Sequence, residues 1–104
     1  MARMVVIYKP PKDAAAFDKH YVEVHVPLAK KLQGLRKYEV SLGPIVTPAG
    51  GPPFHMVATL HFDSLGAMQS AFATPEGRAC AADRRVLAPN DTDLIMLLFD
   101  DREV

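Results

Sequence analysis

The chain has few groups that could cross-link it and no excess charge that would attract a polyanion. It is 104 residues long and contains one cysteine, Cys80, so no disulfide can form within it. Its 12 basic residues are balanced by 12 acidic ones, so it has no excess of positive charge that would bind nucleic acid or an anionic membrane. No apolar run near either end approaches the roughly 20 residues that span a bilayer, and no signal-peptide pattern opens the chain. The sequence predicts one cytoplasmic domain, residues 1–104, that binds neither nucleic acid nor membrane.

The apolar residues follow an ordered series of strand and helix patterns. The strand pattern is found at residues 4–8, 37–42, 54–62 and 93–99, and the helical pattern at residues 14–32, 64–72 and 74–86. Asp13, one of Asp63 and Ser64, and Thr74 are expected to cap the helices. The order strand, helix, strand, strand, helix, strand predicts an α+β, ferredoxin-like βαββαβ fold.

The first and last strands are apolar on both faces. Residues 4–8 and 94–99 are apolar at every position, whereas a strand with one face in water carries polar residues at alternate positions. The helices of this chain can cover one face of the sheet. We expect a second copy to cover the other face, which gives a homodimeric α+β barrel. The alternative is that loops bury the strand ends.

His25 lies two residues before Pro27, inside the first predicted helix. Proline has no N–H and its ring clashes with the carbonyl of Glu23, so we expect the helix to break there with Val26 extended. A histidine at such a break can face a cavity, and its ordinary pKa of about 6.5 suits proton transfer at neutral pH. The alternative is a structural histidine that bonds the loosened backbone.

Tyr38 shares a strand face with Val40 and Leu42, the face on which the helices are expected. Its hydroxyl could orient a ligand oxygen or could belong to a core tyrosine. A ligand pocket between helices and sheet is predicted from Phe17, Tyr21, Met56, Ala58, Met68 and Phe72. Apolar surfaces that contain methionine accept varied apolar ligands.

The other histidines do not form a metal-binding pattern. His55 and His61 are expected on the opposite face of the sheet, too far apart along a strand to share an ion. His20 and His25 are five residues apart, which misses the one-face spacing of an ideal helix. No metal site is therefore predicted.

Two further residues could have a chemical role but are assigned a structural one. Asp83 could orient a pocket group, yet its neighbours Arg84 and Arg85 favour a solvated ion-pair surface. Cys80 has no adjacent histidine or lysine, so it is predicted to be a small buried residue and not a nucleophile.

The segment around His25 resembles a known family. The matching residues are His25-Val26-Pro27-Leu28-Ala29, Gly34-Leu35-Arg36, Tyr38 and Gly43, which resemble the signature of the EthD (ethyl tert-butyl ether degradation) family. Residues 37–40 are also similar to a strand of the methylmuconolactone methylisomerases, which are catalytic relatives. The resemblance implies a dimeric α+β barrel with a small-molecule cavity, and it assigns His25 and Tyr38 to the active site by position. It implies no particular reaction, because this fold hosts many.

These observations lead to a functional hypothesis. The protein is expected to bind a small apolar cyclic or aromatic metabolite of a catabolic pathway and to act as a cofactor-independent isomerase or cyclase. His25 would be the acid/base group and Tyr38 would orient an oxygen; proton transfer requires no metal or cofactor, so none is predicted. The alternatives are a non-catalytic accessory protein that holds an intermediate in the same cavity, and haem binding with a histidine as axial ligand.

Overall fold

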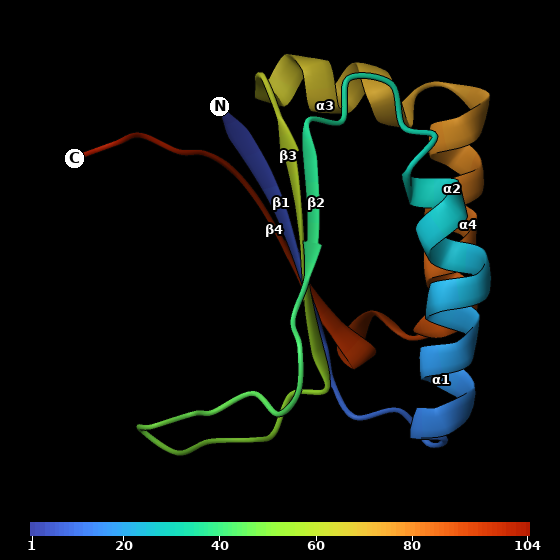
Figure 1. Cartoon of the computed structure of the whole chain (residues 1–104), viewed down its shortest axis with the longest axis vertical. Coiled ribbons are helices and arrows are strands. Elements are labelled where there is room, and N and C mark those ends of the chain that lie inside the picture. The colour runs from blue at the N-terminus through green and yellow to red at the C-terminus, as the bar shows by residue number, and fades with distance from the viewer.

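The computed structural model describes residues 1–104 as a four-stranded sheet with helices on one face (Figure 1). The strands are β1 (Ala2–Tyr8), β2 (Lys37–Val40), β3 (Met56–Phe62) and β4 (Leu94–Asp100). The helices are α1 (Ala14–His20), the π-helix η1 (Tyr21–His25), α2 (Val26–Ala29), α3 (Leu65–Phe72), α4 (Pro75–Leu87) and the 3-10 turn η2 (Asp91–Asp93). All strand pairs are antiparallel in the order β2-β3-β1-β4, which confirms the predicted ferredoxin-like βαββαβ fold. None of the helices has the length and hydropathy of a transmembrane segment.

The predicted N-caps start three of the helices. Asp13 precedes α1, Ser64 precedes α3 and Thr74 precedes α4. Each side chain accepts a hydrogen bond from the main-chain N–H three residues on, at 3.1, 3.0 and 3.0 Å respectively. These bonds satisfy donors that the first turn of a helix leaves without a partner.

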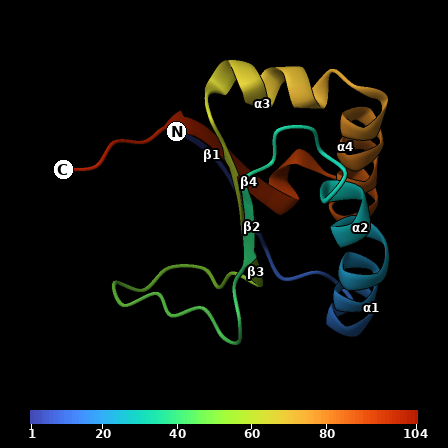
Figure 2. The same ribbon diagram turned by 45° about the horizontal axis from the view of Figure 1, so that its top comes forward.

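Strands β2 and β3 are shorter than the sequence patterns predict. β2 ends at Val40 and not at residue 42, and β3 begins at Met56 and not at residue 54. The intervening segment is rich in proline, which cannot donate to a ladder, and it runs away from the helical layer (Figure 2). Leu42, predicted on the helix-facing side, is 99% exposed because it lies in this segment.

The two faces of the sheet differ in what covers them. The helix-facing side chains of β1 and β3, among them Met4, Val6 and Leu60, are buried. On the other face, five apolar residues of β1 and β4 form what we call the outer apolar patch: Val5, Ile7, Ile95, Leu97 and Phe99. The three that belong to β4 are exposed in the single chain. The helices thus bury the inner face over β1 and β3 but leave Met96 and Leu98 of β4 exposed, and no helix covers the outer face.

His55 lies on the helix side of the sheet, which corrects the prediction that it faces outward with His61. Its Nε2 is 2.6 Å from Asp18 Oδ1 on α1, and its ring meets the Phe17 ring edge-on at 5.2 Å. The alternation of faces fails here because His55 precedes the first residue of β3. His61 does lie on the outer face, as predicted. Its ring is buried, and its Nε2 is 2.7 Å from Glu39 Oε1.

The prediction that the first helix breaks at Pro27 is wrong. The helix instead widens into a π-turn just before the proline. The N–H of Val26 bonds the carbonyl of Tyr21, five residues back, and Val26 has helical φ and ψ of −57° and −48°. The predicted extended conformation of Val26 is therefore wrong. The chain continues through Pro27 into α2 as a helix, so a π-turn before the proline is enough to accommodate it.

Candidate functional site

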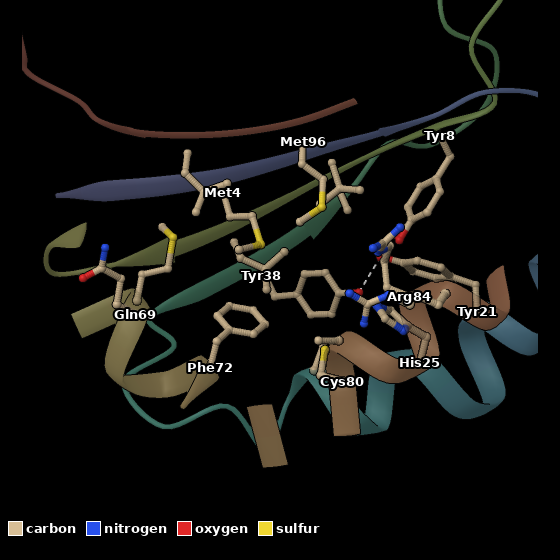
Figure 3. A pocket seen from close by; sticks show the side chains of 18 residues that line it. Met4, Tyr8, Tyr21, His25, Tyr38, Gln69, Phe72, Cys80, Arg84 and Met96 are labelled. Carbon is tan, nitrogen blue, oxygen red and sulfur yellow. Dashed lines mark hydrogen bonds between the residues drawn. The ribbon is translucent and has the colours of Figure 1, made fainter. Parts of the chain in front are cut away.

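A cavity of about 360 Å³ lies between the inner face of the sheet and helices η1, α3 and α4 (Figure 3). Much of its wall is apolar and comes from both layers, with Met4, Ala58, Leu60, Met68, Phe72 and Met96 among the lining residues. This volume falls in the range of about 300–1,000 Å³ that is usual for small-molecule sites.

The predicted pocket residues fall into two groups. Tyr21, Ala58, Met68 and Phe72 line the cavity, as do His25 and Tyr38. Phe17 and Met56 do not line it. Phe17 packs edge-on against the Tyr8 ring at 5.2 Å, and Met56 borders a separate groove beside the β2–β3 loop. Both are displaced towards the end of the sheet where α1 begins, whereas the cavity lies nearer α3 and α4.

His25 is the last residue of η1 and is 6% exposed. Its Nδ1 lies 2.9 Å from Asp83 Oδ2, while its Nε2 has no hydrogen-bond partner. No fully buried side-chain nitrogen or oxygen lacks a partner, so this Nε2 is not fully buried, and His25 lines the cavity. Burial lowers the pKa of His25 below its ordinary value and outweighs the opposing effect of Asp83. The ring is therefore neutral at pH 7, with Nδ1–H donated to Asp83 and the Nε2 lone pair towards the cavity.

Asp83 is buried at 8% exposure, which corrects the prediction of a solvated ion-pair surface. Its Oδ1 is 2.8 Å from His20 Nε2 and its Oδ2 holds His25, so one carboxylate joins two histidines. The sequence does contain a signal for this burial. Cys80, Asp83 and Leu87 are spaced three and four apart, as on the buried stripe of a helix.

The π-helix explains why His20 and His25 reach the same carboxylate. On an ideal α-helix, positions five apart point in different directions, and the sequence prediction used that geometry. In a π-turn the hydrogen bond runs from residue i to i+5, so residues five apart are one turn apart on the same face. A helix that broke at Pro27 would not bring the two histidines together in this way.

Three tyrosine hydroxyls gather near His25 (Figure 3). The hydroxyl oxygens of Tyr21 and Tyr38 are 2.5 Å apart, so one donates to the other and a second O–H remains available to a ligand. The Tyr8 hydroxyl has no protein partner and, by the same reasoning as for Nε2 of His25, borders the cavity. Burial raises the pKa of all three phenols, so they remain protonated donors at neutral pH. Sequence reasoning identified Tyr38 and Tyr21 but not Tyr8.

Cys80 is buried in the cavity wall, as predicted. Burial raises the pKa of its thiol to about 11, so almost none is thiolate at neutral pH. The structure also contains no group of three or more histidine, cysteine, aspartate or glutamate side chains that could hold a metal ion.

Known structures share this fold. An EthD family protein from Bacillus halodurans aligns with a TM-score of 0.86 at 29% identity, over 98% of this chain and 99% of that one. A dimeric ferredoxin-like protein of unknown function from Thermobifida fusca has a TM-score of 0.67 at 16% identity, over 94% and 88% of the chains. A cofactor-independent oxygenase from Streptomyces nogalater has a TM-score of 0.61 at 16% identity, over 99% and 94%. The last two similarities show a common fold alone and carry no information about activity.

Sequence comparison is more specific. The chain is 36% identical over 104 residues to an uncharacterized 11.0 kDa protein encoded in the thcB-thcC intergenic region of Rhodococcus erythropolis, covering 99% of this chain and 96% of that protein. The EthD domain model matches residues 9–90, a span that includes His25, Tyr38 and Asp83. The fold, this match and the signature around His25 together show that the chain belongs to the EthD family.

Proposed function

We propose that this protein binds a small, largely apolar cyclic or aromatic metabolite in the cavity and converts it by proton transfer, as a cofactor-independent isomerase or cyclase. The observation that carries the proposal is the environment of His25. One ring nitrogen is held by a buried carboxylate, and the other borders an apolar cavity without a protein partner. A general base requires this arrangement of orienting group, base and open space.

The reaction would use the groups already present in the wall. Neutral His25 takes a proton at Nε2 from a carbon next to a carbonyl of the ligand, and Asp83 stabilises the imidazolium that forms. The free O–H of the Tyr21–Tyr38 pair donates to the carbonyl oxygen, which gains negative charge. His25 then returns the proton at another carbon. The proton that leaves one carbon is added to another, so no oxidant or reductant is consumed.

A non-catalytic accessory role is the second candidate. Asp83 joins η1 to α4 through two histidines, and such a link would also serve as a structural tie between helices. In that case the same cavity would hold a pathway intermediate without converting it.

We also propose that the protein is a homodimer in which a second copy covers the outer apolar patch. The three β4 residues of the patch are exposed in the single chain, and relatives of the same fold are dimeric. Light scattering at micromolar concentration should give about twice the chain mass of 11.4 kDa. A well-folded monomer under these conditions would contradict the proposal.

Turnover and binding, measured on the same ligand, separate catalysis from accessory binding. A panel of lactones, enols and quinone-like ring compounds is screened for binding, and each hit is assayed with the native protein, His25→Ala and Tyr38→Phe. In His25→Ala we expect turnover to fall about a hundred- to ten-thousand-fold. The dissociation constant should change by less than about tenfold, the effect of one neutral hydrogen bond.

His55→Ala is the matched control, because His55 is also a helix-side histidine paired with an aspartate but does not line the cavity. It should leave turnover unchanged. A ligand that binds without conversion, or that His25→Ala converts as well as the native protein, would favour the accessory role.

A further inference from the structure

The cavity wall carries positive charge and no negative charge. Two arginines of α4, Arg84 and Arg85, line it, and no aspartate or glutamate does. The nearest carboxylate in the sequence, Asp83, does not line the cavity, and both of its oxygens are bound to histidines. This imbalance is local, because the chain as a whole has a formal net charge of zero.

Arg84 is half-buried and has no acidic partner. None of the ion pairs in the structure includes it. Its one side-chain hydrogen bond runs from a guanidinium nitrogen to the carbonyl of Ala88, just beyond the end of α4, at 3.4 Å. An arginine in the last turn commonly bonds such a carbonyl. That bond uses one of five N–H donors and leaves the others free.

The free donors of Arg84 lie among other donors. Figure 3 shows Arg84 at the end of the cavity where His25, Tyr8 and Tyr21 gather, with Phe72 and Gln69 at the other end. Arg84 is close enough to Tyr8 to oppose electrostatically the increase in pKa that burial causes in that phenol. A cation in a largely apolar cavity has lost water and gained no counter-charge from the protein. The missing partner is a group with negative charge and several acceptor positions.

We infer that the ligand is an anion, a cyclic or aromatic acid whose carboxylate pairs with Arg84 while its ring lies against Met4, Met68 and Phe72. The inference rests on the proposed function, in that the cavity is the ligand site. A carboxylate matches the planar fork of a guanidinium and can accept a further hydrogen bond from a tyrosine O–H. Arg85, which is exposed, lies where it would attract an anion into the cavity but is hydrated and contributes less to binding.

Matched charged and neutral ligands test this inference. Binding of 1-naphthoate and of 1-naphthamide, which has nearly the same shape but no charge, is measured by calorimetry at pH 7.5. The native protein should bind the carboxylate at least about tenfold more tightly than the amide. Arg84→Gln should remove this preference without changing the affinity for the amide. Arg84→Lys should keep part of it, because lysine retains the charge but not the fork.

Arg102→Gln is the matched control, since it removes the same charge from the exposed C-terminal segment and should keep the full preference. A carboxylate preference that survives in Arg84→Gln would overturn the inference, as would equal binding of the two compounds to the native protein. Equal binding would leave the proposed cavity function standing. If neither compound binds, both the inference and the proposed use of the cavity for one- or two-ring ligands fail.

Discussion

The two faces of the sheet are built from alternate residues of the same strands, yet they are incomplete in different ways. On β1, Met4 and Val6 point to the helices, while Val5 and Ile7 point to the outer apolar patch. The inner face is covered by the chain's own helices over β1 and β3, and between the layers lies a cavity of about 360 Å³ that the exposed β4 residues Met96 and Leu98 border. The outer face is apolar over β1 and β4 and has no cover from the chain (Figure 2). A strand in which polar and apolar residues do not alternate therefore indicates that both of its faces are to be buried. It does not indicate what buries each face.

The cavity follows from small side chains that face one another across the two layers. Ala58 lies on β3, Ala29 on α2 and Ala81 on α4, and all three line the cavity. Larger residues at these positions would fill the volume, as close packing in protein interiors normally does. The outer patch contains no alanine or glycine, and its apolar side chains, Phe99 among them, are of the kind found in the core of a protein interface.

The largest expected effect concerns the outer face. Leu97→Glu places a carboxylate in the centre of the outer apolar patch, where Leu97 is 46% exposed in the single chain. If a second copy covers the patch, burying an unpaired charge there costs several kcal/mol, and the dimer should dissociate at micromolar concentration. Sedimentation velocity should then give a monomer.

Val86→Glu is the control for Leu97→Glu, because Val86 is an exposed apolar residue on α4 outside the patch. It should sediment like the native protein. If Leu97→Glu remains a dimer, the outer patch is not the interface.

The next effect concerns how the helices are fixed above the inner face. A Cβ on Gly77 would lie 2.2 Å from the carbonyl oxygen of Ala71 and 2.4 Å from Cα of Phe72, so Gly77→Ala forces α3 and α4 apart. Overpacking of this kind costs about 1–3 kcal/mol, and more when backbone atoms must move. Urea unfolding at fixed protein concentration should show the loss.

Gly66→Ala is a matched change in the same helical layer. A Cβ on Gly66 would meet only Ser64 Oγ, at 3.7 Å. A glycine inside a helix makes the folded state less stable than an alanine does, because glycine loses more conformational freedom on folding. Gly66→Ala should therefore raise the free energy of unfolding by about 0.5–1 kcal/mol. Changes of equal size and sign in the two variants would contradict the close contact between α3 and α4.

Local sequence patterns predicted the fold because its elements depend on neighbouring residues. Cap residues such as Thr74, the apolar strands and the order of elements are all properties of short segments. The candidate site depends on contacts between distant segments, and Asp83 meets His25 across 58 residues. The local rule that proline ends a helix fails at Pro27, because a π-turn is enough to accommodate the ring. Without that turn, His20 and His25 could not be placed on one face.

A smaller effect is expected in the pH dependence of stability. Burial lowers the pKa of His25 in the folded protein, so the unfolded chain binds more protons than the folded one near and below pH 6.5. The stability that neutral His25 contributes is present above its unfolded pKa of about 6.5 and is lost as pH falls through the lower folded pKa. The melting temperature should therefore decrease between pH 7.5 and pH 5. His25→Gln should reduce this decrease, and His55→Gln, whose residue lies outside the cavity, should reduce it less. Equal pH profiles for the native protein and His25→Gln would contradict the burial of the neutral ring.

The smallest effect is a pair of opposite shifts in the pKa of His25, measured by NMR titration of its imidazole nitrogens. Asp83 raises this pKa against the larger effect of burial, so Asp83→Asn should lower it further and should disturb the tautomer with Nδ1–H donated. His20, which is held by the same carboxylate, lowers this pKa by charge repulsion, so His20→Gln should raise it. Opposite signs are expected because the carboxylate of Asp83 favours the charged imidazolium, whereas charge on His20 disfavours it. If both variants shift the pKa in the same direction, the charges of His20 and Asp83 do not act on His25 as the structure implies, and the role of Asp83 reduces to joining η1 and α4.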